Sequence, residues 1–114
     1  LEKAIQKNIH PKNKPVRIHI KLDTGMHRLG FDEKDIDGLI KMIQQNELLH
    51  IQSVFSHLAA SDDTSHNDFT QLQFTRLTEM SNKIQKASKH PVFKHLLNSA
   101  GISRFPEYQM DMVR

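Results

Sequence analysis

The sequence predicts an α/β fold in which parallel β-strands alternate with α-helices, and two observations support this class. Segments with the pattern of strands are separated by segments with helical periodicity that are long enough to serve as crossover connections. Polar and cationic residues gather where the predicted strands end, and parallel α/β folds build their sites at the carboxyl ends of their strands. At 114 residues the chain can form one small domain at most.

The chain begins with a predicted helix end and a predicted strand. Leu1–Ile9 has the pattern of the last turns of a helix, which Pro11 and Pro15 would close. Val16–Asp23 follows as the first strand, because apolar and polar residues alternate along it without a break.

The next two elements are a helix and a second strand. Asp32–Asn46 is predicted to be an amphipathic helix with Asp32 as its N-cap. Its apolar stripe consists of Ile36, Leu39, Ile40 and Ile43. Leu49–His57 is predicted to be the second strand.

The second half of the chain repeats this alternation. Ala59 to Asn67 is polar and rich in turn formers, which predicts a loop. Asp68 to Ser88 is predicted to be a long helix. One face of this helix carries Leu77, Met80, Ile84 and Ala87. Val92–Asn98 is expected to form a third strand, and Gln109–Val113 a short fourth one.

The first strand favours a closed barrel over an open sheet. A flavodoxin-like open sheet and a piece of a (β/α)8 barrel both fit the order of elements. One face of the strand is apolar and the other is polar, the latter carrying Arg17, His19, Lys21 and Asp23. A barrel lumen whose mouth holds a charged ligand explains the polar face, and an edge strand is the alternative. With four predicted strands, we expect about half of a (β/α)8 TIM-type barrel.

Composition excludes several classes of protein. The absence of cysteine rules out a disulfide scaffold, a thiolate zinc site and a cysteine nucleophile. No window approaches the roughly 18 apolar residues of a membrane span. The net charge is only +3, with basic residues interleaved with acidic ones and few aromatic residues, so we expect no nucleic-acid binding. The histidine spacings do not match a zinc site, so no metal is expected.

The residues at the predicted strand ends suit an anionic ligand. The first strand runs into a segment with Lys21 and Arg28, the second ends in His57, and the third ends in Asn98 and Ser99. A serine hydroxyl and backbone N–H groups at a helix start suit a phosphate, while arginine suits a carboxylate. Each residue alone also has a plain structural explanation, as a surface charge, a core histidine or a helix cap.

Five segments together resemble one known family. They are Lys21-Leu-Asp-Thr-Gly-Met-His-Arg-Leu-Gly30, Phe55-Ser-His57, His95-Leu-Leu-Asn-Ser-Ala100, Arg104-Phe-Pro106 and Asp111-Met-Val-Arg114. In order and spacing they resemble successive blocks of the alanine racemases, across Pro15 to Arg114. The resemblance implies the (β/α)8 barrel domain of an enzyme that uses pyridoxal 5'-phosphate to interconvert L- and D-alanine for peptidoglycan precursors. It also implies a homodimer in the bacterial cytoplasm.

The resemblance implies catalytic roles for three residues. Lys21 matches a lysine that is carbamylated in the family, and Arg28 matches the arginine that this group orients beside the substrate carboxylate and the cofactor ring oxygen. His57 matches a histidine near the cofactor that hydrogen-bonds into the site. Charge favours the modification, because a carbamate on Lys21 would convert repulsion with Arg28 into an ion pair.

The resemblance also implies a set of cofactor contacts, to which His57 again belongs. His95 matches the residue that supports an arginine facing the pyridine ring, and Arg114 matches that arginine. Asn98 and Ser99 match the loop at the cofactor phosphate. An arginine can only donate to the pyridine nitrogen and leaves it unprotonated, which weakens the ring as an electron sink and favours racemisation over transamination.

Residues 1–114 are expected to be a fragment of the barrel domain, without the first barrel strands and without the family's β-rich C-terminal domain. The resemblance places the Schiff-base lysine upstream of Leu1 and the tyrosine base downstream of Arg114, and Tyr108 does not match that tyrosine. We therefore expect the isolated chain to be inactive. His27 and Leu97 depart from the family, since many relatives have a small residue and an alanine there.

Two alternatives to alanine racemisation stay open. One is a racemase of another amino acid on the same scaffold. The other is a barrel protein that binds pyridoxal phosphate without catalysis, although a pure carrier needs no arginine for a substrate carboxylate.

Overall fold

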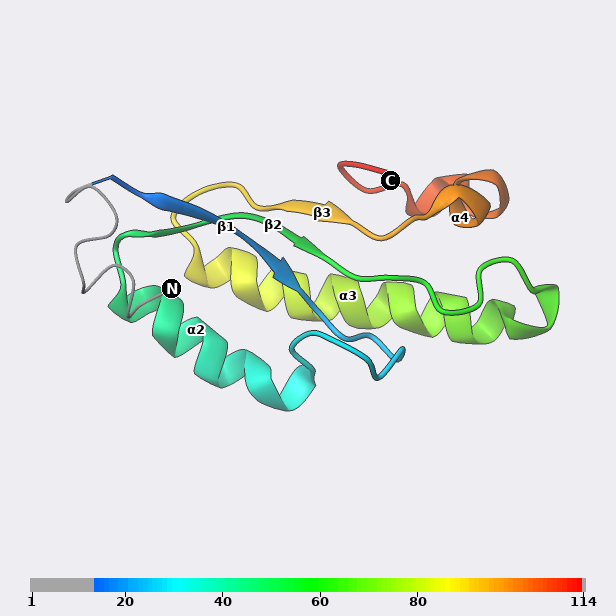
Figure 1. Ribbon diagram of the computed structural model, residues 1–114, viewed down its shortest axis with the longest axis horizontal. Coiled ribbons are helices and arrows are strands. Elements are labelled where there is room, and N and C mark those ends of the chain that lie inside the picture. Colours follow the sequence, from blue (N-terminus) through cyan, green and yellow to red (C-terminus); the bar gives the residue numbers. More distant parts are fainter. Residues whose placement is uncertain (1–13, 114) are drawn as a thin grey trace.

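The computed structural model describes residues 14–113, which form a three-stranded parallel sheet with helices packed against it (Figure 1). The strands, in spatial order, are β1 (Val16–Lys21), β2 (Leu49–Phe55) and β3 (Phe93–His95). The helices are α2 (Ile36–Gln45), α3 (Asn67–Ala87) and α4 (Ser99–Arg104). The helix expected over Leu1–Ile9 lies outside the described residues.

The arrangement of strands and helices is that of a barrel segment. Consecutive strands are neighbours in the sheet, and the crossover helices α2 and α3 lie on the same side of it (Figure 1). A doubly wound sheet has helices on both faces, whereas the strands of a (β/α)8 barrel follow one another with every helix outside. The α/β class and the barrel geometry predicted from the sequence therefore hold for residues 14–113.

The sheet register aligns three residues of the predicted site region. Lys21 of β1 is paired with Phe55 of β2, and Phe55 is paired with His95 of β3. A register shift after Ile18 places His19 opposite Ser53, and the His19 ring nitrogen lies 2.7 Å from the Ser53 hydroxyl. The three strands therefore end at a common edge.

A single apolar core joins the sheet to α2 and α3. The predicted helix stripes are confirmed for Ile36, Leu39, Ile43, Leu77, Met80 and Ile84, which are buried, whereas Ile40 and Ala87 are half-buried. β1 meets them through Ile20, and Leu22, directly after the strand, is buried in the same core. Asp32, predicted as the N-cap of the helix, instead caps the 3-10 turn Glu33–Asp35, where its side chain accepts a hydrogen bond from the Lys34 backbone. The helix α2 follows from Ile36, with Asp35 at its N-cap position.

The fourth strand predicted over Gln109–Val113 does not form, so that prediction is wrong for its secondary structure. The segment makes only an isolated parallel bridge between Met112 and His95. Met110 has a φ of 51°, which interrupts extended backbone, and Asp111 instead bonds Lys94 through both its backbone N–H and its carboxylate. The described residues thus hold three strands of the barrel.

The strand ends are also shorter than predicted. The third strand was expected over Val92–Asn98 but covers only Phe93–His95, because Asn98 caps the following helix. The polar stretch from Ala59 to Asn67 was expected to be a loop, and within it Asp63 caps a 3-10 turn over Thr64–His66. A local side-chain bond to the backbone decides the structure in both places.

Gly30 provides a test of the fold. Its φ is +126°, and an added Cβ would lie 2.9 Å from backbone atoms of Lys21, Leu22 and Asp23. We expect Gly30→Ala to lower the free energy of unfolding by about 1–3 kcal/mol, since neither the backbone strain nor the contact can relax cheaply. Denaturant unfolding measures this effect.

The matched control is Gly38→Ala on α2. A Cβ there meets nothing within 4 Å, and alanine is favoured over glycine inside a helix. Gly38→Ala should leave stability unchanged or raise it. Equal unfolding midpoints for Gly30→Ala and the unmodified protein would contradict the description of this turn.

Candidate functional site

A cavity of about 410 Å³ opens at the carboxyl ends of the three strands. Its lining residues are Lys21, Arg28, Phe55, Ser56, His57, His95, Leu96, Leu97, Asn98 and Ser99. All the predicted site residues within the described part of the chain are among them. Arg114, the remaining predicted residue, lies outside the described residues.

Sheet pairing builds the floor of the cavity. The ring of Phe55 stacks on the ring of His95, with centroids 4.9 Å apart and planes 5° from parallel. The His95 carbonyl accepts a hydrogen bond from the Ser56 backbone N–H at 3.3 Å. His95 is buried while His57 is exposed, so the two histidines meet the cavity in different ways.

The loop after β1 folds back and brings Arg28 to the same cavity as Lys21. The Phe31 backbone N–H donates to the Lys21 carbonyl at 3.0 Å, and the Asp23 backbone N–H donates to the Phe31 carbonyl at 2.8 Å. Asp23 also accepts hydrogen bonds from the backbone N–H groups of Gly25 and His27, at 2.9 and 3.0 Å. These contacts close a tight loop over residues 23–31.

The electrostatics of this loop assign Asp23 a structural role. Burial opposes its charged form, but the hydrogen bonds from Gly25 and His27 and the charge of His27 outweigh that effect and lower the pKa of Asp23. His27, which departs from the family pattern, has a φ of 53°. This is the left-handed region, in which histidine is several-fold enriched among non-glycine residues.

A buried amide joins this loop to the loop after β2. The Gln73 side chain, from α3, donates from Nε2 to Thr24 Oγ1 at 3.1 Å and to the His57 carbonyl at 3.0 Å. Its Oε1 accepts a hydrogen bond from the Ala59 backbone N–H at 3.0 Å. Thr24 Oγ1 in turn lies 2.8 Å from Ser56 Oγ. The segments that present Arg28 and His57 are thereby tied to one helix.

Sequence reasoning missed Gln73, Thr24 and Ser56 as parts of the site. Gln73 is fully buried, four and seven positions before Leu77 and Met80 on the apolar stripe of α3. A glutamine in register with an apolar stripe is the signal that could have identified it. Arg76, one turn along, adds a bond from its guanidinium to the Thr24 carbonyl at 3.2 Å.

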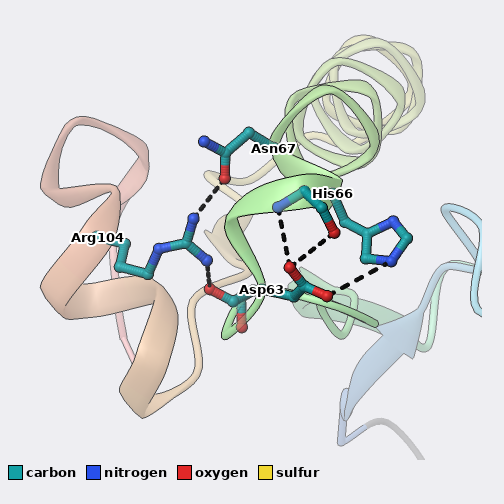
Figure 2. A network of polar contacts seen from close by, with 6 residues as sticks. Asp63, His66, Asn67 and Arg104 are labelled. Carbon is teal, nitrogen blue, oxygen red and sulfur yellow. Dashed lines mark hydrogen bonds and ion pairs between the residues drawn. The ribbon is translucent and has the colours of Figure 1, made fainter.

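The short helix α4 is held at both of its ends. Asn98 Oδ1 caps the Gly101 N–H at 3.0 Å and also accepts a bond from the Ser61 hydroxyl at 2.8 Å. At the other end, the Arg104 guanidinium donates to the Ser61 carbonyl and to the Asn67 side-chain oxygen (Figure 2). The position of Ser99 at the cavity is therefore fixed by the loop that follows β2.

Asp63 stabilises the turn that leads into α3. Its carboxylate accepts bonds from the Ser65 hydroxyl at 2.7 Å and the Ser65 backbone at 2.9 Å, and these bonds lower the pKa of Asp63. The carboxylate also lies 3.7 Å from the His66 ring (Figure 2). This network lies beside Arg104 and away from the cavity lining.

The chemistry of the lining suits an anion. Lys21 and Arg28 supply positive charge, Ser56 and Ser99 supply hydroxyl groups, and the lining residues include no carboxylate among the described part of the chain. Residues 14–113 contain no group of three histidine, cysteine or acidic side chains that could hold a metal. None of the helices in that range is long and apolar enough to cross a membrane.

The fold and the site together define the class of protein. Parallel strands with helices on one side and a cavity lined by basic and hydroxyl side chains at the carboxyl strand ends are features of a (β/α)8 barrel. The family model described as "Alanine racemase, N-terminal domain" matches residues 1–114. The chain belongs to this family.

Individual relatives agree with the family match. The chain is 37% identical over 112 residues to an alanine racemase of Methanococcus maripaludis, covering 97% of this chain and 30% of the relative. It is 32% identical over 101 residues to one of Geobacillus stearothermophilus, covering 88% of this chain and 25% of the relative. The chain thus spans about 30% or less of the length of these relatives.

Solved structures of the family share the fold. The alanine racemase of Bacillus anthracis with bound L-Ala-P superposes with a TM-score of 0.80 at 27% identity, over 99% of this chain and 29% of that one. The enzyme of Corynebacterium glutamicum gives 0.79 at 26% identity, over 98% of this chain and 30% of that one. These likenesses confirm the prediction of a partial TIM-type barrel.

Proposed function

We propose that this chain is the cofactor-binding part of an alanine racemase, with residues 1–114 forming a fragment of its pyridoxal phosphate-binding barrel domain. The supporting observation is that one cavity is lined by the family-matching residues Lys21, Arg28, His57, His95, Asn98 and Ser99. They come from the last residues of strands and from the loops that follow three different strands, so their convergence is a property of the fold rather than of the sequence. The family match of the whole chain supports the same conclusion.

The donors in the cavity fit pyridoxal 5'-phosphate. The cavity volume of about 410 Å³ lies within the range of small-molecule sites. A phosphate monoester needs hydrogen-bond donors, and Ser99 offers a hydroxyl group at the start of α4, where Asn98 caps the helix. When bound, the cofactor withdraws electrons from the Cα atom of an amino acid and so makes the α-proton acidic.

Each residue then has a proposed task. Asn98 and Ser99 hold the phosphate, Arg28 binds the carboxylate of alanine, and His57 hydrogen-bonds to the ligands from the loop after β2. His95, stacked on Phe55, supports the side of the site that faces the pyridine ring.

Two further roles rest on the resemblance. Arg114, outside the described residues, is proposed to donate to the pyridine nitrogen. Racemisation also needs a base on each side of Cα, and the resemblance assigns these bases to a lysine and a tyrosine of the family outside residues 1–114. A homodimer that acts in the bacterial cytoplasm on peptidoglycan precursors belongs to the same proposal.

Arg28 gives the most direct test of substrate binding. In the complete protein that contains this segment, we expect D-alanine to form from L-alanine in the presence of pyridoxal phosphate. Arg28→Leu should raise KM for alanine about tenfold or more, because a charge-assisted bond to the carboxylate is lost. A coupled assay that detects D-alanine measures both the racemase activity and the KM for alanine.

Lys41→Leu is the matched control, since Lys41 is exposed on α2 and does not line the cavity. Its kinetics should match those of the unmodified protein. Preferential turnover of a different amino acid would contradict alanine as the substrate. An unchanged KM for alanine in Arg28→Leu would contradict the role of Arg28 in binding the substrate carboxylate.

Lys21 is proposed to carry a carbamate. Lys21 and Arg28 line one cavity whose described lining residues include no carboxylate, and a carbamate would pair with the guanidinium. In ¹³C-bicarbonate, the complete protein should show a carbamate carbon signal that disappears in Lys21→Arg and persists in Lys34→Arg, where the lysine is exposed. A signal that survives Lys21→Arg would refute the modification at this residue.

A further inference from the structure

The buried amide of Gln73 can adopt only one orientation. The backbone N–H of Ala59 can only donate, so the atom 3.0 Å from it must be the amide oxygen. The carbonyl of His57 can only accept, so the atom 3.0 Å from it must be the amide nitrogen. Two partners of opposite character therefore fix which end of the amide is which.

This orientation sets the direction of the next hydrogen bond. The second proton of Gln73 Nε2 is donated to Thr24 Oγ1, which therefore accepts. Thr24 is buried, and its hydroxyl proton needs a protein acceptor. Within the described residues the hydroxyl of Ser56, at 2.8 Å, is that acceptor. If Ser56 donated instead, the Thr24 proton would be buried without a partner, which is costly.

The hydroxyl proton of Ser56 is then not used in the contact with Thr24, and Ser56 lines the cavity. A serine hydroxyl donates one hydrogen bond, and the contact with Thr24 uses Ser56 Oγ as an acceptor. The residue is also held through its backbone, which donates to the His95 carbonyl at 3.3 Å. Among the described residues the hydroxyl makes no further hydrogen bond, and because Ser56 lines the cavity its proton can be donated there.

We propose that Ser56 is a ligand-binding residue whose hydroxyl donates to an anionic oxygen of the molecule in the cavity, and that Gln73 is the positioning residue that sets this direction. The inference rests on the proposed function for the identity of that molecule. A phosphate oxygen of the cofactor and a carboxylate oxygen of alanine share the required chemistry. Both accept a hydrogen bond from a neutral hydroxyl.

The experiment uses the complete protein with four substitutions: Ser56→Ala, Gln73→Met, the two combined, and Gln71→Met as the control on the exposed side of α3. The dissociation constant for pyridoxal phosphate is measured by absorbance titration, and KM for alanine by D-alanine formation. Ser56→Ala should raise one of the two about tenfold. A rise in the dissociation constant assigns the contact to the cofactor, and a rise in KM alone assigns it to the substrate carboxylate.

The double substitution separates positioning from general stability. If Gln73 acts through Ser56, the combined variant binds no more weakly than the weaker single variant. The inference is overturned if the losses of affinity in the two single variants multiply in the combined variant. It is also overturned if Ser56→Ala matches the unmodified protein in both the dissociation constant for pyridoxal phosphate and the KM for alanine. Ser56→Ala removes the acceptor of the Thr24 proton but keeps the three hydrogen bonds of the Gln73 amide, so it decides the matter even if Gln73→Met does not fold.

A failure of the proposed function is distinguished by the behaviour of the unmodified protein. In that case the unmodified protein would neither bind pyridoxal phosphate nor racemise alanine. Neutron diffraction from the deuterated protein then tests the inference without any ligand. The Thr24 deuteron should lie between Thr24 and Ser56, and the Ser56 deuteron should point to the cavity; the reverse order would overturn the inference.

Discussion

The site depends on one buried amide group. Gln73 is fully buried inside the apolar interface of α3, where an unpaired amide would cost about 1–3 kcal/mol for each unsatisfied group. It avoids that cost by bonding Thr24, His57 and Ala59, which belong to two different loops. Desolvation makes these bonds obligatory, so the loops after β1 and β2 have to meet at the same point.

The apolar core determines where Gln73 meets the two loops. Leu77, Met80 and Ile84 pack α3 against the sheet, and Gln73 lies one turn before Leu77 on the same stripe. The parallel register brings Lys21 and His95 into line with Phe55 at the strand ends. Core packing thus places α3, the sheet register aligns the strand ends, and the Gln73 amide joins the loops that follow them.

The fold could be predicted from the sequence because its signals are local or periodic. The stripe of Ile36, Leu39 and Ile43 and the capping by Asp32 depend on residues within a few positions of one another. The segment 109–113 was assigned to a strand because a short apolar run does not distinguish a strand from a single bridge. The positive φ of Met110, which decided the outcome, leaves no mark in the sequence.

The site was predictable only in part. Strand-end position and family resemblance identified Lys21, Arg28 and His57, and the structure brings them to one cavity. The Gln73 network was not predictable, because its partner Thr24 is 49 positions away in the sequence. A hydrogen bond of that separation is visible only once the fold is known.

Gln73 holds the loops after β1 and β2 to α3. Amide hydrogen exchange at Ala59, compared between the unmodified protein, Gln73→Met and Gln71→Met, tests this role most directly because the Ala59 N–H donates to Gln73 itself. We expect faster exchange at Ala59 in Gln73→Met, with exchange at Ile51 and Val54 in the buried strand unchanged and with no change in the Gln71→Met variant. Ala59 exchange that is equally slow in Gln73→Met would contradict it.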